Sequence, residues 1–353
     1  MKILTSHATL TDVAREAQVG TTTVSRVING GDRVSPATLE RVQAVIKRLG
    51  YQPNHAARIL KGESTKTVGL IVPSIADSFF SSCAEAAQKV SRLHHFLLIA
   101  TSSNNQTQME LENLNVLIQH RVDGLLIAPA VSYNRELIDV LNRTSTPVVA
   151  FDRPIHNSSI PSVVSDNYKG AWEATRHLIS HGYKRIVCFG VKGEESLYTI
   201  KERIRGYRRA VREANLPSGI EMSIYDYQSA ELAVKTHLQG PNPPDAIFAL
   251  KNLATIYICE ALQKMNIGVP QTIALIGFDD FELASTLKPS ITVVKQQMER
   301  IGEVATKLLF EKLQLGKKYF KVAARTGCNS NITRLETELI LRNSCGCNKQ
   351  CLD

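Results

Sequence analysis

The chain has 353 residues, of which 43% are hydrophobic and 6% aromatic, a composition typical of soluble α/β proteins with two or three domains. The sequence has no run of 18 apolar residues and no apolar N-terminal region long enough for a signal peptide, so we expect a cytoplasmic protein without membrane contact. The net charge is +9, and the segment from Met1 to Lys66 contributes +5 of it, with ten Lys or Arg against five acids. A basic module of this kind suits contact with nucleic-acid phosphates.

Two short helices separated by a break at residues 18–20 are predicted between Thr9 and Asn29. Thr9 and Asp12 have the spacing of a capping box, and the first helix has one apolar face: Leu10, Val13, Ala14 and Ala17. The second helix has an apolar stripe and an outward polar face of Thr21, Thr22, Ser25 and Arg26. This pattern indicates a helix-turn-helix whose second helix enters the DNA major groove, although periodicity alone also allows a simple helical hairpin.

A third helix is predicted from Ser35 as N-cap and Pro36 at the first helical position to a stop at Gly50. Three helices can then close a core of about fifty residues. Pro53 next breaks the chain, and Asn54 can cap one more short helix.

The segments TTVSRVING, VS and LGY-PN in this order resemble the N-terminal motif of the lactose-repressor (LacI/GalR) family of bacterial transcription regulators. The resemblance is specific from Thr9 to Gly62 and continues in patches to about residue 343. It implies a dimeric repressor with a helix-turn-helix DNA-binding headpiece (residues 1–52) and a hinge helix or linker (53–65) that folds on the operator. The remaining chain would form a periplasmic-binding-protein-like core.

From Lys66 onward, apolar strands alternate with helices, which predicts two doubly wound lobes with parallel sheets. We expect a core over 66–345, followed by a tail over 346–353. Lobe 1 would comprise about 66–165 and 295–325, and lobe 2 about 166–294 and 326–345; the family pattern places the helix at 298–315 in lobe 1. Two such lobes form a hinged cleft at the carboxyl ends of their strands.

Polar residues gather where the predicted strands end: Asp152-Arg153, Lys251-Asn252 and Asp279-Asp280, with Arg203 in a following helix. Paired carboxylates could perform acid–base catalysis, but the chain has no G-x-G-x-x-G after the first strand, no P-loop, no G-x-S-x-G and no H-E-x-x-H. Carboxylates and an arginine suit the hydroxyls of a sugar equally well. We therefore predict a binding protein without a cofactor, rather than an enzyme.

The family resemblance implies effector contacts by Asp152, Arg203 and Asp279, an aromatic platform near Tyr227, and stacking by Phe80, for which a core position is the alternative. At Lys251-Asn252 the chain departs from the family pattern, which usually has Asn-Asp at these two positions. A buried ammonium requires an anionic neighbour. Either Asp279 alone neutralises Lys251, or the ligand is a sugar acid or sugar phosphate in preference to a neutral sugar.

For the DNA contacts, we expect Thr21, Thr22 and Arg26 to read base edges, with Arg26 on a guanine, and Ser25 and Asn29 to contact phosphates. Leu60 would wedge into the minor groove. The full predicted set is Thr9, Thr21, Thr22, Ser25, Arg26, Asn29, Val34, Asn54, Ala57 and Leu60.

These features predict a sequence-specific repressor of carbohydrate genes that binds a near-palindromic double-stranded operator as a homodimer and responds to a small sugar-type effector. No Leu heptad follows Arg342, which disfavours a helix-bundle tetramer. The alternatives are a global regulator controlled by a protein partner and a sugar-binding protein or enzyme with a helical appendage.

Seven cysteines are present. Cys83, Cys188 and Cys259 fall in apolar patterns, where a thiol packs as a small hydrophobe. Cys345, Cys347 and Cys351 cluster near the C-terminus but lack paired C-x-x-C spacing and a convincing fourth ligand, so we predict oxidation-prone tail thiols and no metal.

Overall fold

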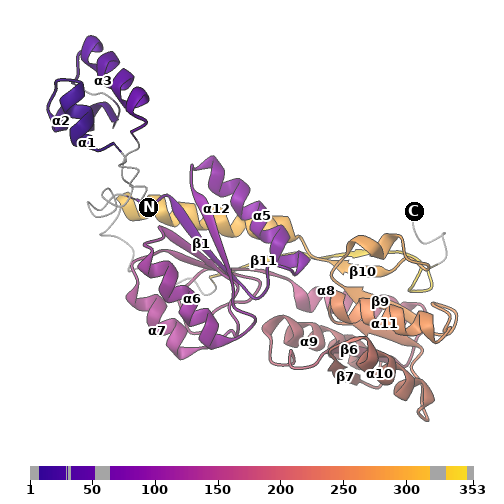
Figure 1. The fold of residues 1–353 in the computed structure, drawn as a ribbon. Helices are drawn as coiled ribbons and strands as arrows, with labels where there is room; N and C mark the ends of the chain where they lie inside the picture. The colour runs from indigo at the N-terminus through magenta and orange to yellow at the C-terminus, as the bar shows by residue number, and fades with distance from the viewer. Residues whose placement is uncertain (1–7, 29, 31–32, 52–63, 319–330, 348–353) are drawn as a thin grey trace, which may run out of the picture. The chain divides into compact units, whose positions relative to one another are not determined.

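The structure is a computed structural model that describes residues 8–28, 30, 33–51, 64–318 and 331–347. It divides into two compact units, Met1–Thr65 and Lys66–Asp353 (Figure 1). Within the described ranges, no helix has the length and apolar character needed to cross a membrane.

The N-terminal unit contains α1 (Leu10–Glu16), α2 (Thr21–Ile28) and α3 (Pro36–Leu49). The capping box predicted at Thr9 and Asp12 is confirmed, and α3 begins after the Ser35 N-cap and ends at Gly50, whose φ of 60° is left-handed. The three helices bury a small core: Val13, Ala14, Ala17, Val24, Val27, Val42 and Val45. The short helices are therefore stabilised by packing on one another, as the sequence predicted.

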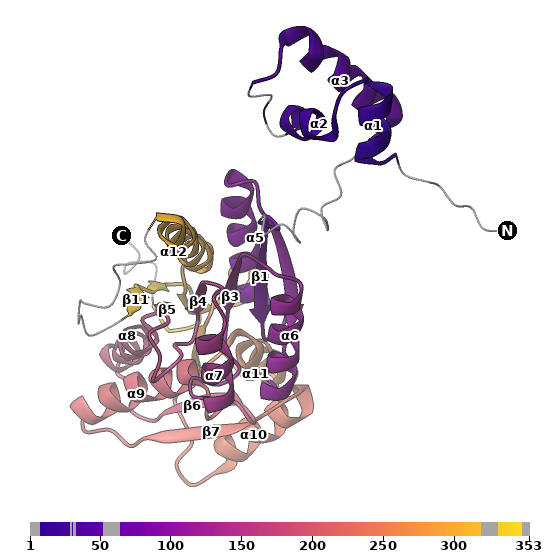
Figure 2. The same ribbon diagram turned by 90° about the vertical axis from the view of Figure 1, so that its left-hand side faces the viewer.

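The first lobe is built on a six-stranded parallel sheet whose order is β11-β5-β4-β3-β1-β2; β11, β5, β4, β3 and β1 are labelled in Figure 2. The strands are β1 (Thr67–Val72), β2 (Leu97–Ser102), β3 (Gly124–Ile127), β4 (Val148–Phe151), β5 (Ser162–Ser165) and β11 (Ile332–Leu335). One face packs on α5 (Ser78–Leu93) and α12 (Met298–Lys318), the other on α6 (Thr107–Gln119) and α7 (Arg135–Arg143) (Figure 2).

The second lobe repeats this plan with the order β12-β10-β9-β8-β6-β7, parallel except for β12. Its strands are β6 (Ile186–Val191), β7 (Gly219–Ile224), β8 (Ala246–Ala249), β9 (Ala274–Phe278), β10 (Thr292–Lys295) and β12 (Glu338–Ile340). One face carries α8 (Asn167–Ser180) and α9 (Tyr198–Glu213); the other carries α10 (Tyr227–Gln239) and α11 (Asn252–Lys264), and the 3-10 helix η1 (Glu282–Ser285) follows β9.

The return of α12 to the first lobe is confirmed by its packing on α5, β3 and β4. The assignment of residues 326–345 to the second lobe is wrong for β11, which pairs in parallel with β5 and closes the edge of the first sheet. The chain thus crosses between the sheets after β5, after β10 and again between β11 and β12. In each sheet the chain reverses its direction of travel between central strands, and the carboxyl ends of strands beside such a reversal form a ligand crevice.

Candidate functional site

The outward face of α2 carries the predicted DNA-reading residues. Thr21, Thr22 and Arg26 are exposed, whereas Val24 and Val27 on the opposite face are buried in the core of the unit. A helix of eight residues that exposes this polar face and adds a long cationic side chain fits a helix that reads a groove.

The other predicted DNA contacts divide into three groups. Thr9 is exposed at the N-cap of α1, and Ser25 is half-buried on α2. Val34 is half-buried and packs against the core of the headpiece. The remaining four lie outside the described residues: Asn29, Asn54, Ala57 and Leu60.

A pocket in the core unit is formed by residues that follow strand ends in both lobes, as expected for a cleft at the carboxyl ends of the strands. Its first-lobe side carries Asp77 after β1 and Asp152 after β4, and its second-lobe side carries Lys251 after β8 and Asp279 after β9. Further residues complete the lining: Phe79, Phe80, Arg153, Glu194, Leu197, Thr199, Ile200, Arg203 and Gln296. Five of the six predicted effector residues are therefore brought together.

Asp152 and Asp279 occupy equivalent places in the two lobes. Each directly follows a buried strand, and their φ angles of 63° and 73° are left-handed, a conformation that costs on the order of 1–3 kcal/mol in a non-glycine residue. Burial raises the pKa of Asp152, although the guanidinium groups of Arg153 and Arg203 act in the opposite direction. Two buried carboxyls held in strained positions at one pocket indicate a site selected for binding rather than for backbone stability.

Arg203 is fixed at this pocket by contacts with three elements. Its Nε donates to Asn167 Oδ1 (2.8 Å), its Nη1 donates to the Leu250 carbonyl (2.6 Å), and Nη1 lies 3.4 Å from Asp279 Oδ2. The guanidinium also stacks 3.6 Å from the ring centroid of Phe278. Held in this way, Arg203 presents donors in a fixed geometry with little entropy left to lose on binding.

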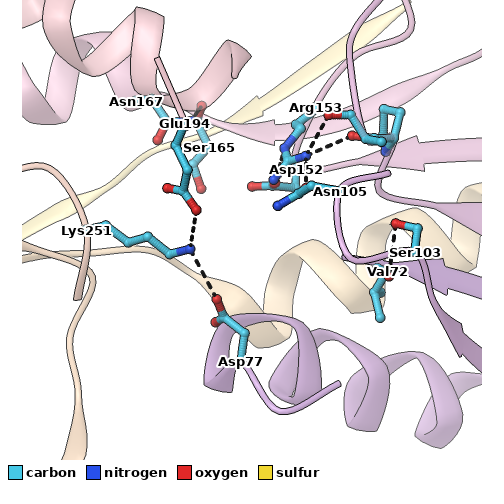
Figure 3. Close-up of polar contacts among 12 residues, drawn as sticks. Val72, Asp77, Ser103, Asn105, Asp152, Arg153, Ser165, Asn167, Glu194 and Lys251 are labelled. Atoms are coloured by element: carbon cyan, nitrogen blue, oxygen red, sulfur yellow. Dashed lines mark hydrogen bonds and ion pairs between the residues drawn. The ribbon is translucent and has the colours of Figure 1, made fainter. Parts of the chain in front are cut away.

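Arg153 is held in the first lobe in a similar manner. Its Nη1 donates to Asn105 Oδ1 (2.7 Å) and to the carbonyls of Pro129 (3.0 Å) and Ala130 (3.2 Å), and its Nε lies 3.2 Å from Asp152 Oδ2 (Figure 3). Nε makes no hydrogen bond among the described residues despite being buried. It is therefore a donor that a ligand acceptor can satisfy.

Lys251 joins the two lobes. Its Nζ lies 3.0 Å from Glu194 Oε1 and 3.7 Å from Asp77 Oδ2, between the two carboxylates in Figure 3. Burial lowers the pKa of Lys251, but the two carboxylates outweigh this effect and raise the pKa above its ordinary value. The prediction that Asp279 alone or an anionic ligand must neutralise Lys251 is wrong, because Glu194 and Asp77 do so.

Two aromatic predictions have different outcomes. Phe80 lines the pocket and also packs in the first-lobe core, with its ring centroid 6.4 Å from that of Phe151, so the core position is confirmed and stacking on an effector stays a prediction. Tyr227 is not among the pocket-lining residues. Its hydroxyl donates to Glu231 Oε2 (2.9 Å) and Lys264 Nζ lies 4.8 Å from its ring centroid, so the predicted platform at Tyr227 is not supported.

Sequence reasoning missed Asp77, Glu194 and Gln296. Each follows a strand, so the rule that identified Asp152 could have found them. Gln296 Nε2 donates to Asp279 Oδ1, whereas its buried Oε1 has no partner among the described residues. Asp280, in contrast, is turned away to form two 3.0 Å contacts with Arg342.

The pocket is narrow in this conformation and partly open to solvent. The centres of water-sized molecules have only about 30 Å³ between its side chains. A ligand of sugar size therefore requires the lining residues to move apart, and the contact between Lys251 and Asp77 spans the two lobes.

Comparison with known proteins matches both units. Residues 9–54 match the family described as "Bacterial regulatory proteins, lacI family", and residues 65–333 match "Periplasmic binding proteins and sugar binding domain of LacI family". Catabolite control protein A of Priestia megaterium is 34% identical over 86% of this chain and 92% of its own length. The transcriptional repressor PurR of Aliivibrio salmonicida is 31% identical over 87% of this chain and 92% of its own length.

Solved structures agree. A complex of the transcriptional regulator CelR with cellobiose has a TM-score of 0.68 and 29% identity, covering 96% of this chain and 99% of that one. A lac repressor dimer bound to operator and an anti-inducer has a TM-score of 0.81 over the same shares at 23% identity, a likeness of fold. From the headpiece, the two-lobed core and these matches together, the chain belongs to the lacI family of DNA-binding bacterial transcription regulators.

Proposed function

We propose that this protein is a cytoplasmic repressor of carbohydrate genes that binds a near-palindromic operator as a homodimer and is controlled by a neutral polyhydroxylated effector in the interlobe pocket. The observation that carries the proposal is the joining of this pocket to a helix-turn-helix unit in one chain. The relative solved with cellobiose supports a sugar as the effector class.

A neutral effector is favoured by the charges of the pocket. Among its described lining residues, the four carboxylates are Asp77, Asp152, Glu194 and Asp279, and the three cations are Arg153, Arg203 and Lys251. The cations are already paired with carboxylates at 3.0 to 3.4 Å. Since no positive charge is left over, a carboxylate or phosphate on the ligand would have no uncompensated partner.

Matched calorimetric titrations of the full chain test the effector class. We expect an aldose to bind more tightly than its aldonic acid or its phosphate ester, and Asp279→Asn to weaken binding by roughly 10-fold or more, since each lost hydrogen bond to a charged group costs about 1.5–3 kcal/mol. Tyr227→Leu is the matched control and should bind as the unmodified protein does. Tighter binding of both anionic partners would refute the neutral-effector proposal.

Control by a protein partner is a second candidate, which the narrowness of the pocket favours. A pocket this narrow admits a sugar only after movement of its lining, and another protein could shift the same lobe equilibrium from outside. If no sugar in the titrations binds while operator binding is intact, this second candidate replaces the first.

Homodimer formation is supported by apolar surface at one edge of the first lobe. β2 forms the edge of its sheet, Leu97 on β2 is 60% exposed, and Leu93 at the end of α5 is 79% exposed. Exposed large aliphatic residues on a sheet edge favour an interface. Two headpieces related by a two-fold axis would then read two operator half-sites.

The DNA-reading role of Arg26 is tested by Arg26→Ala in the full chain. The variant should lose roughly 1–3 kcal/mol on the correct operator and almost nothing on unrelated DNA, as measured by fluorescence anisotropy at fixed salt. Arg15→Ala is the control, because Arg15 pairs with Asp12 on α1 at 2.6 Å. An equal loss on both DNAs would make Arg26 a phosphate contact.

A further inference from the structure

Two histidines and two cysteines meet at the end of α8, outside the effector pocket. His177 lies in the last turn of α8 and His181 is its C-cap, so their spacing of four residues places both rings on one side of the helix. Cys345 and Cys347 come from the C-terminal segment after β12. The sequence separates the two pairs by more than 160 residues, and the fold brings them together.

The ligand atoms of His177, His181 and Cys347 already lie close together, and Cys345 Sγ lies beside two of them. Cys347 Sγ lies 3.2 Å from His177 Nε2 and 3.3 Å from His181 Nε2, and these three atoms lie within 4.8 Å of one another. Cys345 Sγ lies 3.3 Å from Cys347 Sγ and 3.4 Å from His177 Nε2. Tetrahedral zinc with Zn–S of about 2.3 Å and Zn–N of about 2.0 Å separates neighbouring ligand atoms by about 3.3–3.8 Å.

The backbone between the cysteines favours this approach. Gly346 has a φ of 86°, and a Cβ built at this position would lie 2.5 Å from the Tyr183 hydroxyl oxygen. The left-handed glycine reverses the chain so that both sulfurs face α8. A side chain at residue 346 would disturb both the turn and the packing.

Contacts around the cluster orient two of its ligand atoms. His181 Nδ1 donates to the His177 carbonyl (2.9 Å), which leaves the neutral ring's lone pair on Nε2, the atom that faces Cys347. Thr292 Oγ1 accepts the Arg342 N–H (2.9 Å) and donates its own proton to Cys345 Sγ (3.1 Å).

The prediction of oxidation-prone tail thiols is wrong for these two cysteines. Cys345 is fully buried and Cys347 is 7% exposed, and both belong to the core formed by α8, α9 and the second sheet. Access of oxidants to such thiols is low. Cys351 lies outside the described residues.

We propose that His177, His181, Cys345 and Cys347 form a structural zinc site that fastens the C-terminal segment to the end of α8. Two thiolates and two imidazoles are a closed ligand set for Zn²⁺, which leaves no open position for a substrate. The ion would replace S–H and imidazole contacts by four bonds, and the two cysteines would release their protons to solvent on binding.

Metal content of the purified full chain tests the site. Under reducing conditions we expect about one zinc per chain by elemental analysis, and Co²⁺ exchanged into the protein should give the visible bands of a tetrahedral ion and a thiolate charge-transfer band. Cys347→Ser and His181→Ala should each lower the zinc content to a small fraction of that value. Cys259→Ser should not change the zinc content, because Cys259 lies on α11, which packs on the other face of the second sheet.

A stability measurement guards against loss of folding in the variants. Chelation of the unmodified protein should lower its thermal midpoint, with full recovery on adding Zn²⁺, whereas the same treatment of a folded His181→Ala variant should change nothing. Folded protein that binds neither Zn²⁺ nor Co²⁺ in the presence of reductant would overturn the proposal. A disulfide between Cys345 and Cys347 in the reduced, metal-supplied protein would also overturn it.

Discussion

Replacement of Lys251 by methionine removes the charge that sits between two pocket carboxylates while keeping most of the side-chain volume. Lys251 is 23% exposed at its side chain, and Glu194 and Asp77 are 16% and 18% exposed. After the substitution these two carboxylates would face each other without a cation. The variant therefore tests whether Lys251 stabilises the empty protein or serves only a ligand.

The expected magnitude follows from the geometry. At separations of 3.0 and 3.7 Å and an effective dielectric constant near 20, each attraction is on the order of 4–6 kcal/mol before desolvation is subtracted. Removing one partner of a fully buried pair costs about 3–5 kcal/mol. Since a fifth of each side chain is exposed, Lys251→Met should lower the free energy of unfolding by roughly 2–4 kcal/mol.

Urea denaturation followed by tryptophan fluorescence measures this loss in the full chain. The sequence has a single tryptophan, Trp172, which lies on α8 and donates its indole N–H to Glu213 (2.8 Å), so the signal reports the second lobe and not the headpiece. Addition of Glu194→Gln should recover part of the loss, because it removes one of the two unpaired charges.

A surface pair provides the control. Lys264 pairs with Glu231 at 3.3 Å but is 64% exposed, so Lys264→Met should cost no more than about 1 kcal/mol. If Lys251→Met is no more destabilising than Lys264→Met, the bridge contributes nothing to the empty protein. Lys251 would then have to be explained by the ligand, and the neutral-effector proposal would fail with it.

Burial raises the pKa of Glu110 to about 7, so between about pH 4.5 and 7 the folded protein keeps a proton that the unfolded chain has released. The free energy of unfolding is therefore highest below about pH 4.5 and falls as the pH rises to about 7. Glu110→Gln should remove roughly 2–4 kcal/mol of that fall, as measured by urea titrations at several pH values. Gly206→Ala would place a Cβ 2.2 Å from the Tyr168 carbonyl oxygen, which should separate α8 from α9 and lower the urea midpoint by roughly 1–3 kcal/mol, and an unchanged midpoint would contradict the close packing. Thr9→Ala breaks the capping box with Asp12 and should destabilise the headpiece by about 1 kcal/mol in thermal circular dichroism, whereas Thr9→Ser should not.

Features set by neighbouring residues were predictable from the sequence. The Thr9 cap, the Ser35 start of α3 and the Gly50 stop each depend on contacts within four residues, and all three are present. The pocket positions of Asp152 and Asp279 follow from a similar local rule, since a residue after a buried parallel strand must lie at the carboxyl edge of the sheet.

Errors arose where a distant segment or a boundary decides the outcome. The family resemblance implied an aromatic platform near Tyr227, but β7 ends at Ile224 and Asp226 caps α10 with Ser229, so Tyr227 opens a helix and turns to Lys264. Tyr227 lies three residues beyond the end of β7, and this difference was enough to misplace its side chain. Strand ends are weak signals here because β7 is half-buried along most of its length and so lacks a continuous apolar pattern.

Long-range pairings carry no local signal at all. Glu194 lies 57 positions before Lys251 in the chain, and Asp77 belongs to the other lobe, so their neutralisation of the ammonium could not be read from the residues around Lys251. The same holds for Cys345 and Cys347, whose partners on α8 were hidden in an ordinary amphipathic helix. In both cases the sequence showed a residue without its partner. For Lys251 this led to the prediction of an anionic ligand, and for Cys345 and Cys347 to the prediction of oxidation-prone thiols.

The helix α8 connects the two sites of the core unit. At its first residue, Asn167 Oδ1 accepts the Arg203 Nε–H that orients this arginine toward the pocket, and at its last turn His177 contacts the cysteines. Between these ends, the absence of a side chain at Gly206 lets the backbones of α8 and α9 approach closely. Because a packed helix moves as a rigid element, fastening its C-terminal end also restrains the position of Asn167, and through it the geometry in which Arg203 meets an effector.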